Sequence, residues 1–192
     1  PFPAGLDDAM TVLGWIHRHA ARAGVDPGQV VVAGASAGGG LAAEACQRAH
    51  DEGISVARQV LVYPMLDDRT AGSNDSGRSW LGWSAASNRY AWRAYLARAQ
   101  GDPPAYAAAA RRDDLRGLPP AWIGVGDLDP FFVEDGDYAR RLRAAGVPCV
   151  LDIVAGMYHA ADLAVDPQPA SMAEFWKRMA TAVSNRPAEE EK

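Results

Sequence analysis

The stretch of sequence that decides the fold reads Val30-Val31-Val32-Ala33-Gly34-Ala35-Ser36-Ala37-Gly38. Its first part is a short apolar run, rich in β-branched residues and bounded by turn residues. Such a run predicts a strand buried on both faces of a parallel sheet. A glycine-rich turn follows, and a helical segment from about residue 38 to residue 52 begins at once. The stretch therefore predicts one strand, a tight turn that carries Ser36, and one helix.

The turn has the G-x-S-x-G pattern that places a nucleophilic serine between a strand and a helix. A turn this sharp should hold Ser36 in strained backbone angles. We expect side chains at Gly34 and Gly38 to collide, so that glycine is needed at both positions. The amide of Ala37, at the start of the helix, is placed to stabilise an oxyanion. The alternative is a phosphate-binding turn with an incidental serine, but the glycine spacing differs from G-x-G-x-x-G and no P-loop lysine follows.

Helices and strands alternate on both sides of this turn. Apolar periodicity predicts helices over about 6–22, 88–99, 132–145 and 170–183, and apolar runs predict strands over 59–64, 121–126 and 149–154. This alternation predicts a mostly parallel sheet with flanking helices, and so an α/β fold. We expect one domain over residues 1–186 and a charged tail over 187–192. The irregular region 65–84 is long enough to cover a functional site.

Composition excludes several classes of function. A formal net charge of −5 with both signs mixed argues against nucleic-acid binding, which needs clustered Lys and Arg. No apolar run reaches the roughly 18 residues that cross a bilayer. Cys46 and Cys149 have no metal-ligand spacing. We expect a protein without a membrane span, a metal or an organic cofactor, located in the cytoplasm, where thiols stay reduced.

Several segments together resemble one known family. The segment from Gly34 to Ala42 is similar to the elbow of the hormone-sensitive-lipase-like esterases, whose usual form is G-D-S-A-G-G; Ala35 departs from it. Further similar segments follow in the family's order: 63–69, 87–89 with Trp92, and 118–122. The resemblance implies an α/β-hydrolase fold and a serine carboxylesterase that hydrolyses small-molecule esters, with short acyl groups, through an acyl-enzyme.

A serine hydroxyl needs an imidazole to accept its proton and a carboxylate to orient that imidazole. Of the four histidines, His17 and His19 precede the serine, whereas this fold has the order Ser, Asp or Glu, then His. His50 lies about 20 Å along the following helix. His159 remains, in a segment similar to the family's H-G-F, with Ala160 and Ala161 replacing the glycine and the phenylalanine.

The carboxylate is assigned from the resemblance. Asp129 matches the position of the family's catalytic acid after a similar strand, and it starts the turn into the next helix. Asp127 is the main competitor. Glu134 and Asp135 fall inside that helix, where they are interpreted as carboxylates that compensate the helix dipole. The expected catalytic residues are thus Ser36, Asp129 and His159.

The resembling esterases also take part of their oxyanion hole from an upstream H-G-G-G segment, which this sequence does not contain. About four strands are predicted, where the family usually has about eight. We therefore expect the C-terminal part of such a fold, with an apolar edge at 30–33 that a homodimer could cover.

Two rival functions share these features. A peptidase or amidase would use the same catalytic residues, and a ligand-binding relative would use none of them. Trp80, Trp83 and Trp92 either line a substrate pocket or belong to the core.

Overall fold

A computed structural model describes residues 1–72, 82–96, 102–164 and 169–184 of the chain. Its centre is a four-stranded sheet in which all neighbouring strands are parallel, in the order β1-β2-β3-β4. The strands are β1 Val31–Ala35, β2 Arg58–Val62, β3 Ala121–Gly126 and β4 Cys149–Val154. The predicted parallel α/β fold is therefore confirmed.

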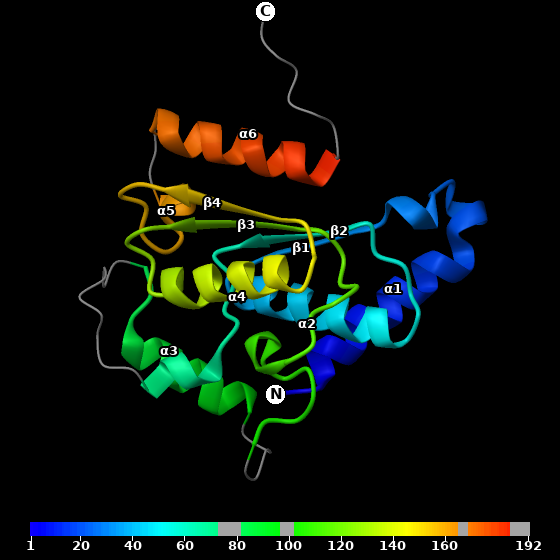
Figure 1. Cartoon of the computed structure of the whole chain (residues 1–192), viewed down its shortest axis with the longest axis horizontal. Helices are drawn as coiled ribbons and strands as arrows, with labels where there is room; N and C mark the ends of the chain where they lie inside the picture. Colours follow the sequence, from blue (N-terminus) through cyan, green and yellow to red (C-terminus); the bar gives the residue numbers. More distant parts are fainter. Residues whose placement is uncertain (73–81, 97–101, 165–168, 185–192) are drawn as a thin grey trace, which may run out of the picture.

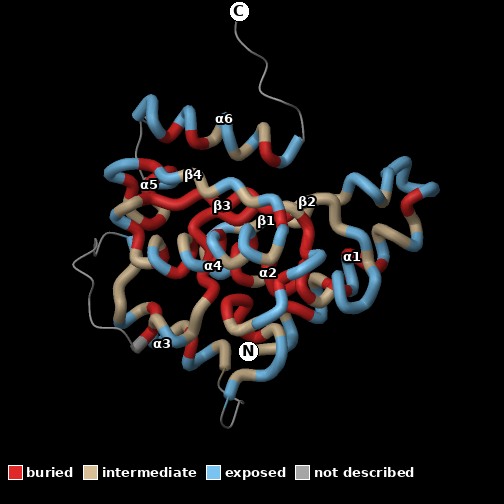
Figure 2. The backbone as a smooth tube through the Cα atoms, in the orientation of Figure 1, coloured by how far each residue is buried: buried red, intermediate tan, exposed pale blue. Residues whose placement is uncertain are grey.

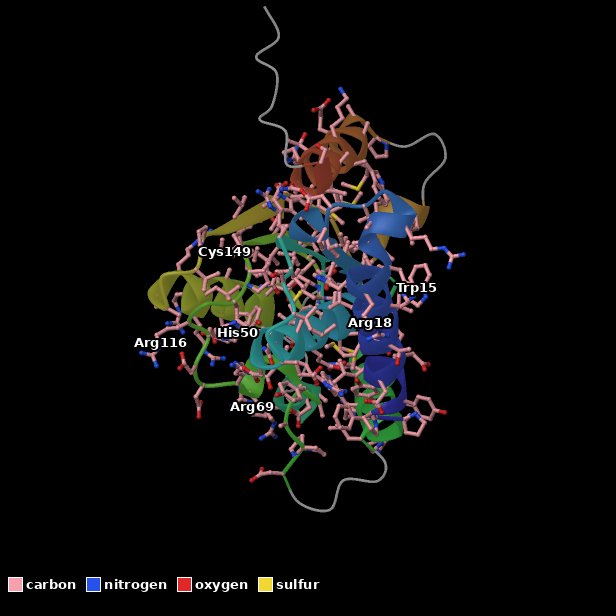
Figure 3. All side chains as sticks on the ribbon, turned by 90° about the vertical axis from the view of Figure 1, so that its right-hand side faces the viewer. Trp15, Arg18, His50, Arg69, Arg116 and Cys149 are labelled. Carbon is pink, nitrogen blue, oxygen red and sulfur yellow. The ribbon has the colours of Figure 1, made fainter. Side chains whose placement is uncertain are left out.

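Within the described residues the α-helices are α1 Ala4–Ala23, α2 Ala37–Asp51, α3 Ala85–Tyr95, α4 Phe132–Ala144, α5 Ala161–Ala164 and α6 Ala170–Ser184. Helices α2 and α4 cover one face of the sheet and α6 covers the other (Figure 1). Helix α1 packs against α2. Its outer side carries Trp15, which is half exposed and stacked on His19, and Arg18 (Figure 3).

Buried residues are concentrated in and around the sheet (Figure 2). Two of the apolar clusters in the described residues lie on opposite faces of the sheet. Between the sheet and helices α2 and α4 lie Leu61, Ile123, Tyr138 and Leu142, all fully buried. Between the sheet and α6 lies a second cluster that includes Trp122 and Phe175. All six residues of β3 are buried, because this strand is central and covered on both faces.

The prediction for the strand before Ser36 is wrong in one respect. Strand β1 is not buried on both faces: Val31, Val32 and Gly34 are half-buried, and Ala33 and Ala35 are exposed. The reason is its place in the sheet, because within the described residues β1 pairs only with β2. The apolar edge expected at this strand is present.

Some element boundaries differ from the predictions for local reasons. Strand β2 ends at Val62, before Pro64, because Tyr63 takes a φ of 35°, outside the extended region. Helix α3 begins at Ala85 because Ser84 caps it, its hydroxyl accepting a hydrogen bond of 3.1 Å from the Ser87 amide. The single-turn helix α5 was not predicted, because four residues are too few for a periodic apolar pattern. The charged tail over 187–192 lies outside the described residues.

A helix that crosses a bilayer needs about 20 predominantly apolar residues. No helix in the described ranges is long and apolar enough to cross a membrane.

Candidate active site

The turn that joins β1 to α2 holds Ser36 in a strained conformation, with φ 55° and ψ −122°. Such a backbone costs on the order of 1–3 kcal/mol in a residue other than glycine. Three backbone hydrogen bonds fix it in place. The Ser36 amide donates to the carbonyl of Val62 at 2.9 Å, and the Ser36 carbonyl accepts from the amides of Met65 at 3.0 Å and Gly40 at 3.1 Å.

The glycines around this turn have different roles. A Cβ on Gly34 would lie 2.1 Å from the carbonyl oxygen of Gly38, so glycine is required there, as predicted. The steric prediction for Gly38 is wrong, because a Cβ on it would meet no atom of the described residues within 4 Å. Gly39 and Gly40 are required instead. Their Cβ atoms would lie 2.8 Å from Pro64 Cβ and 2.2 Å from the Met65 carbonyl oxygen.

The hydroxyl of Ser36 does not cap helix α2, although Ser36 directly precedes it. A serine at a helix N-terminus usually accepts a hydrogen bond from an amide of the first turn, but Ser36 makes no such bond. Its Oγ lies 2.9 Å from Nε2 of His159, which is 123 residues away in the sequence. The first-turn amides, including that of Ala37, have no carbonyl acceptor within the helix. They are available to a ligand beside Ser36.

His159 connects the serine to a carboxylate. Its Nδ1 lies 2.8 Å from Oδ2 of Asp129, and both residues are almost fully buried. The other Asp129 oxygen accepts a hydrogen bond of 2.9 Å from the Phe131 amide, which fixes the carboxylate. A carboxylate at Nδ1 favours the proton on that nitrogen, because it can only accept. Nε2 is then free to accept the Ser36 proton.

The structure separates Asp129 from the other carboxylates near it in the sequence. Asp127 Oδ1 accepts a hydrogen bond of 2.7 Å from the Gly156 amide, so Asp127 anchors the loop that precedes His159. Glu134 accepts from the amides of Leu66 at 2.8 Å and Asp67 at 3.2 Å. Its burial raises its pKa to about 8. Glu134 thus connects α4 to the segment after β2 through hydrogen bonds. Its role is therefore larger than the predicted compensation of the helix dipole.

Aromatic rings enclose His159. The ring centroids of Tyr63, Phe131 and Trp83 lie 4.7, 5.1 and 6.2 Å from that of the imidazole. The Tyr63 hydroxyl donates a hydrogen bond of 3.0 Å to Asp162. Asp162 lies on α5, three residues after His159. In the sequence, Trp83 is a candidate pocket residue, and Tyr63 is only the first residue of the family-like segment 63–69. The grouping of Tyr63, Phe131 and Asp162 around His159 could not be recognised, because these residues lie on separate elements.

Comparisons with known proteins identify the family of this fold. A family model described as the alpha/beta hydrolase fold matches residues 1–163. The chain belongs to the α/β-hydrolase family.

Named relatives of this α/β-hydrolase are esterases. The esterase LipI of Mycobacterium tuberculosis is 37% identical over 155 residues, which are 77% of this chain and 47% of the relative. Carboxylesterase NlhH of the same species is 34% identical over 172 residues, 83% of this chain and 51% of the relative. The chain thus spans about half the length of these relatives.

Similar solved structures are also esterases. A bacterial heroin esterase superposes on 96% of this chain and 60% of its own with a TM-score of 0.87 and 35% identity. The esterase LipW from Mycobacterium marinum covers 96% of this chain and 58% of its own, with a TM-score of 0.85 and 34% identity.

One pocket of this α/β-hydrolase lies beside the serine turn, between α1, α2 and α3. Its volume is about 270 Å³. Ala37 and Gly38 line it where α2 begins, and Trp92 of α3 lines it as well. Trp92 is also a buried member of an apolar core cluster, so it belongs to both the pocket wall and the core. Trp83 lies beside His159 instead, and Trp80 lies outside the described residues. The remaining pocket residues are Gly5, Leu41, Glu44, Met65, Ala91 and Tyr95.

The other three histidines lie away from this α/β-hydrolase site. His17 and His19 are on α1, and His50 is exposed on the last turn of α2 (Figure 3). These positions agree with the sequence analysis, which excluded the three histidines as the proton acceptor of Ser36.

Proposed function

We propose that this chain carries the catalytic residues of a serine carboxylesterase, and that Ser36, His159 and Asp129 form its catalytic triad. One observation supports the proposal above all. The Ser36 hydroxyl, in a strained turn, contacts Nε2 of a buried histidine whose Nδ1 contacts a buried aspartate. A serine with only a structural role would cap its helix.

The proposed reaction has two halves. Ser36 Oγ attacks the ester carbonyl while His159 Nε2 takes the hydroxyl proton, and the Asp129 carboxylate stabilises the imidazolium. The amide of Ala37 donates to the tetrahedral oxyanion. The C–O bond to the alcohol then breaks, and His159 returns its proton to the departing oxygen. In the second half, His159 activates a water molecule that hydrolyses the acyl-enzyme and releases the carboxylic acid and Ser36.

Three further features bear on the substrate, the compartment and the assembly. The pocket of about 270 Å³ would hold a small ester group, in line with a short acyl chain. Both cysteines are free thiols, as is usual in the cytoplasm. The unpaired side of β1 within the described residues offers an edge that a second copy of the chain would cover.

The decisive experiment is active-site labelling of the protein with a fluorophosphonate ester. We expect one phosphonylated peptide containing Ser36, with no label in Ser36→Ala and loss of p-nitrophenyl acetate hydrolysis in that variant. Ser87→Ala is the matched control, because Ser87 lies at the start of α3 and contacts Ser84. A label on another serine, or full activity of Ser36→Ala, would contradict the proposal. Binding of esters without turnover would support the ligand-binding alternative.

A further inference from the structure

The pocket beside the serine turn contains one ionisable acid that the proposed reaction does not use. Glu44 lies on α2 and lines the pocket, although only 2% of the residue is exposed. Most of the surrounding lining is apolar, with Leu41, Met65 and Trp92 among the neighbours. A carboxyl group in such surroundings loses hydration that one or two hydrogen bonds do not replace.

The partners of Glu44 do not supply a positive charge. Its Oε2 accepts a hydrogen bond of 2.6 Å from the Tyr95 hydroxyl, which is neutral. One turn further along α2, Arg48 pairs with Asp7 of α1 at 2.6 Å and with Glu52 at 2.7 Å. In the part of the chain that the structure describes, no Lys, Arg or His forms an ion pair with Glu44. Burial accordingly raises the pKa of Glu44 to about 8, and the Tyr95 hydroxyl opposes that rise.

We propose that this pocket is a subsite for a cationic, ammonium-bearing group on an otherwise apolar arm of the ester, and that Glu44 is its specificity-determining residue. The inference rests on the proposed esterase function, since it assigns a substrate class to the same site. An ammonium group would give Glu44 the missing opposite charge and further hydrogen-bond donors. The rings of Trp92 and Tyr95 add aromatic surface, which attracts cations more than neutral groups.

The spacing along α2 sets the length of that arm. Glu44 follows Ser36 by eight residues, which is about 12 Å along a helix axis. The Cα–Cβ bond of a helical residue tilts toward the N-terminus, so the carboxyl group lies nearer to Ser36 than this rise suggests. An alkyl chain of about six carbons between the ester and the ammonium group reaches roughly 8 Å, which suits a separation below about 12 Å.

Binding of the cation is coupled to a proton. With a pKa of about 8, Glu44 is mostly protonated at neutral pH. An ammonium ion favours the carboxylate, so its binding releases a proton from Glu44. The affinity for an alkylammonium should therefore rise with pH up to about 8 and then level off. A neutral alcohol of the same length should show no such dependence.

The test uses hexylammonium chloride and hexanol as probes of equal length, with binding followed by calorimetry. Hexylammonium stays charged between about pH 6 and pH 9, since alkylammonium groups titrate near 10.4. At about pH 8.5 we expect it to bind at least about tenfold more tightly than hexanol, the size of one charge-assisted hydrogen bond. Glu44→Gln, which keeps the shape and an acceptor for Tyr95, should lose this preference and keep the hexanol affinity.

Two variants serve as controls. Glu52→Gln removes the same formal charge from an exposed residue that follows α2, and it should keep the preference. Tyr95→Phe removes the competing donor but keeps the ring, so it should keep or increase the preference. Hexylammonium should also inhibit hydrolysis of p-nitrophenyl acetate competitively.

Two results would overturn the inference: wild-type protein that binds hexylammonium no more tightly than hexanol, or a preference that survives in Glu44→Gln. The wild-type ratio decides the matter even where Glu44→Gln does not fold. A protein that prefers hexylammonium but hydrolyses no ester would contradict the esterase proposal alone. Hydrolysis without the preference would contradict the ammonium subsite alone.

Discussion

Nδ1 of His159 lies 2.8 Å from Oδ2 of Asp129, and neither side chain has appreciable contact with solvent. Asp127, only two residues from Asp129, instead accepts a hydrogen bond from the Gly156 amide. Because their partners differ, replacement of each aspartate by asparagine should affect ester hydrolysis differently.

We expect Asp129→Asn to lower kcat for a short-chain p-nitrophenyl ester by about three to four orders of magnitude. The amide would stabilise the wrong imidazole tautomer while leaving the fold intact. Asp127→Asn retains an oxygen acceptor for Gly156 and should lower kcat only slightly. Steady-state kinetics of both variants, with circular dichroism as a check on folding, would test the assignment. Reversed effects would show that Asp127 is the acid.

The glycines in the first turn of α2 differ in the space around them, and this predicts different effects on the free energy of unfolding. Gly40→Ala places a Cβ 2.2 Å from a backbone oxygen, so we expect a loss of about 2 kcal/mol or more in the free energy of unfolding. Gly38→Ala meets open space and replaces glycine in a helix, which favours folding by up to about 1 kcal/mol. Urea denaturation of the two variants measures the difference. Equal destabilisation by both would contradict the steric explanation.

Ala160 follows His159 directly and has a φ of 60°, in the left-handed region that favours glycine. Relief of this strain should make Ala160→Gly more stable than the wild type, by up to about 1 kcal/mol. Ala160→Val should be less stable, because a β-branched side chain tolerates that conformation poorly. Thermal unfolding would rank the three proteins. A wild type more stable than Ala160→Gly would show that the unfolded-state entropy outweighs the strain.

Glu44 also predicts a dependence of stability on pH. Its pKa is raised in the folded protein from 4.5 to about 8, so between these values the folded state binds more protons than the unfolded state. The contribution of Glu44 is therefore complete below about pH 4.5 and is lost as the pH rises to about 8, by at most about 1.4 kcal/mol per pH unit.

Urea denaturation between about pH 5 and pH 8 measures this slope. Glu44→Gln should flatten it, whereas Glu52→Gln should not. A slope that is identical in wild type and Glu44→Gln would show that Glu44 titrates normally in the folded protein.

The helices and strands of the fold could be predicted because their signals are local. The apolar run before Ser36, the glycine turn and the periodicity of α1 each lie within one segment, so the sequence located them within a few residues. Burial of β1 could not be predicted in this way. It depends on which strands lie beside it, and β1 lies at the edge of the described sheet.

The sequence by itself determined the strand–turn–helix around Ser36 and, through chain order and resemblance, the choice of His159 and Asp129. Only the tertiary structure brought these residues within hydrogen-bond distance, gave Asp127 another partner, and moved the steric requirement from Gly38 to Gly39 and Gly40. The hydrogen bond between Glu44 of α2 and Tyr95 of α3 likewise depends on how these two helices pack. The physical reason is that backbone propensity acts over a few neighbouring residues, whereas contacts and burial depend on how distant segments pack.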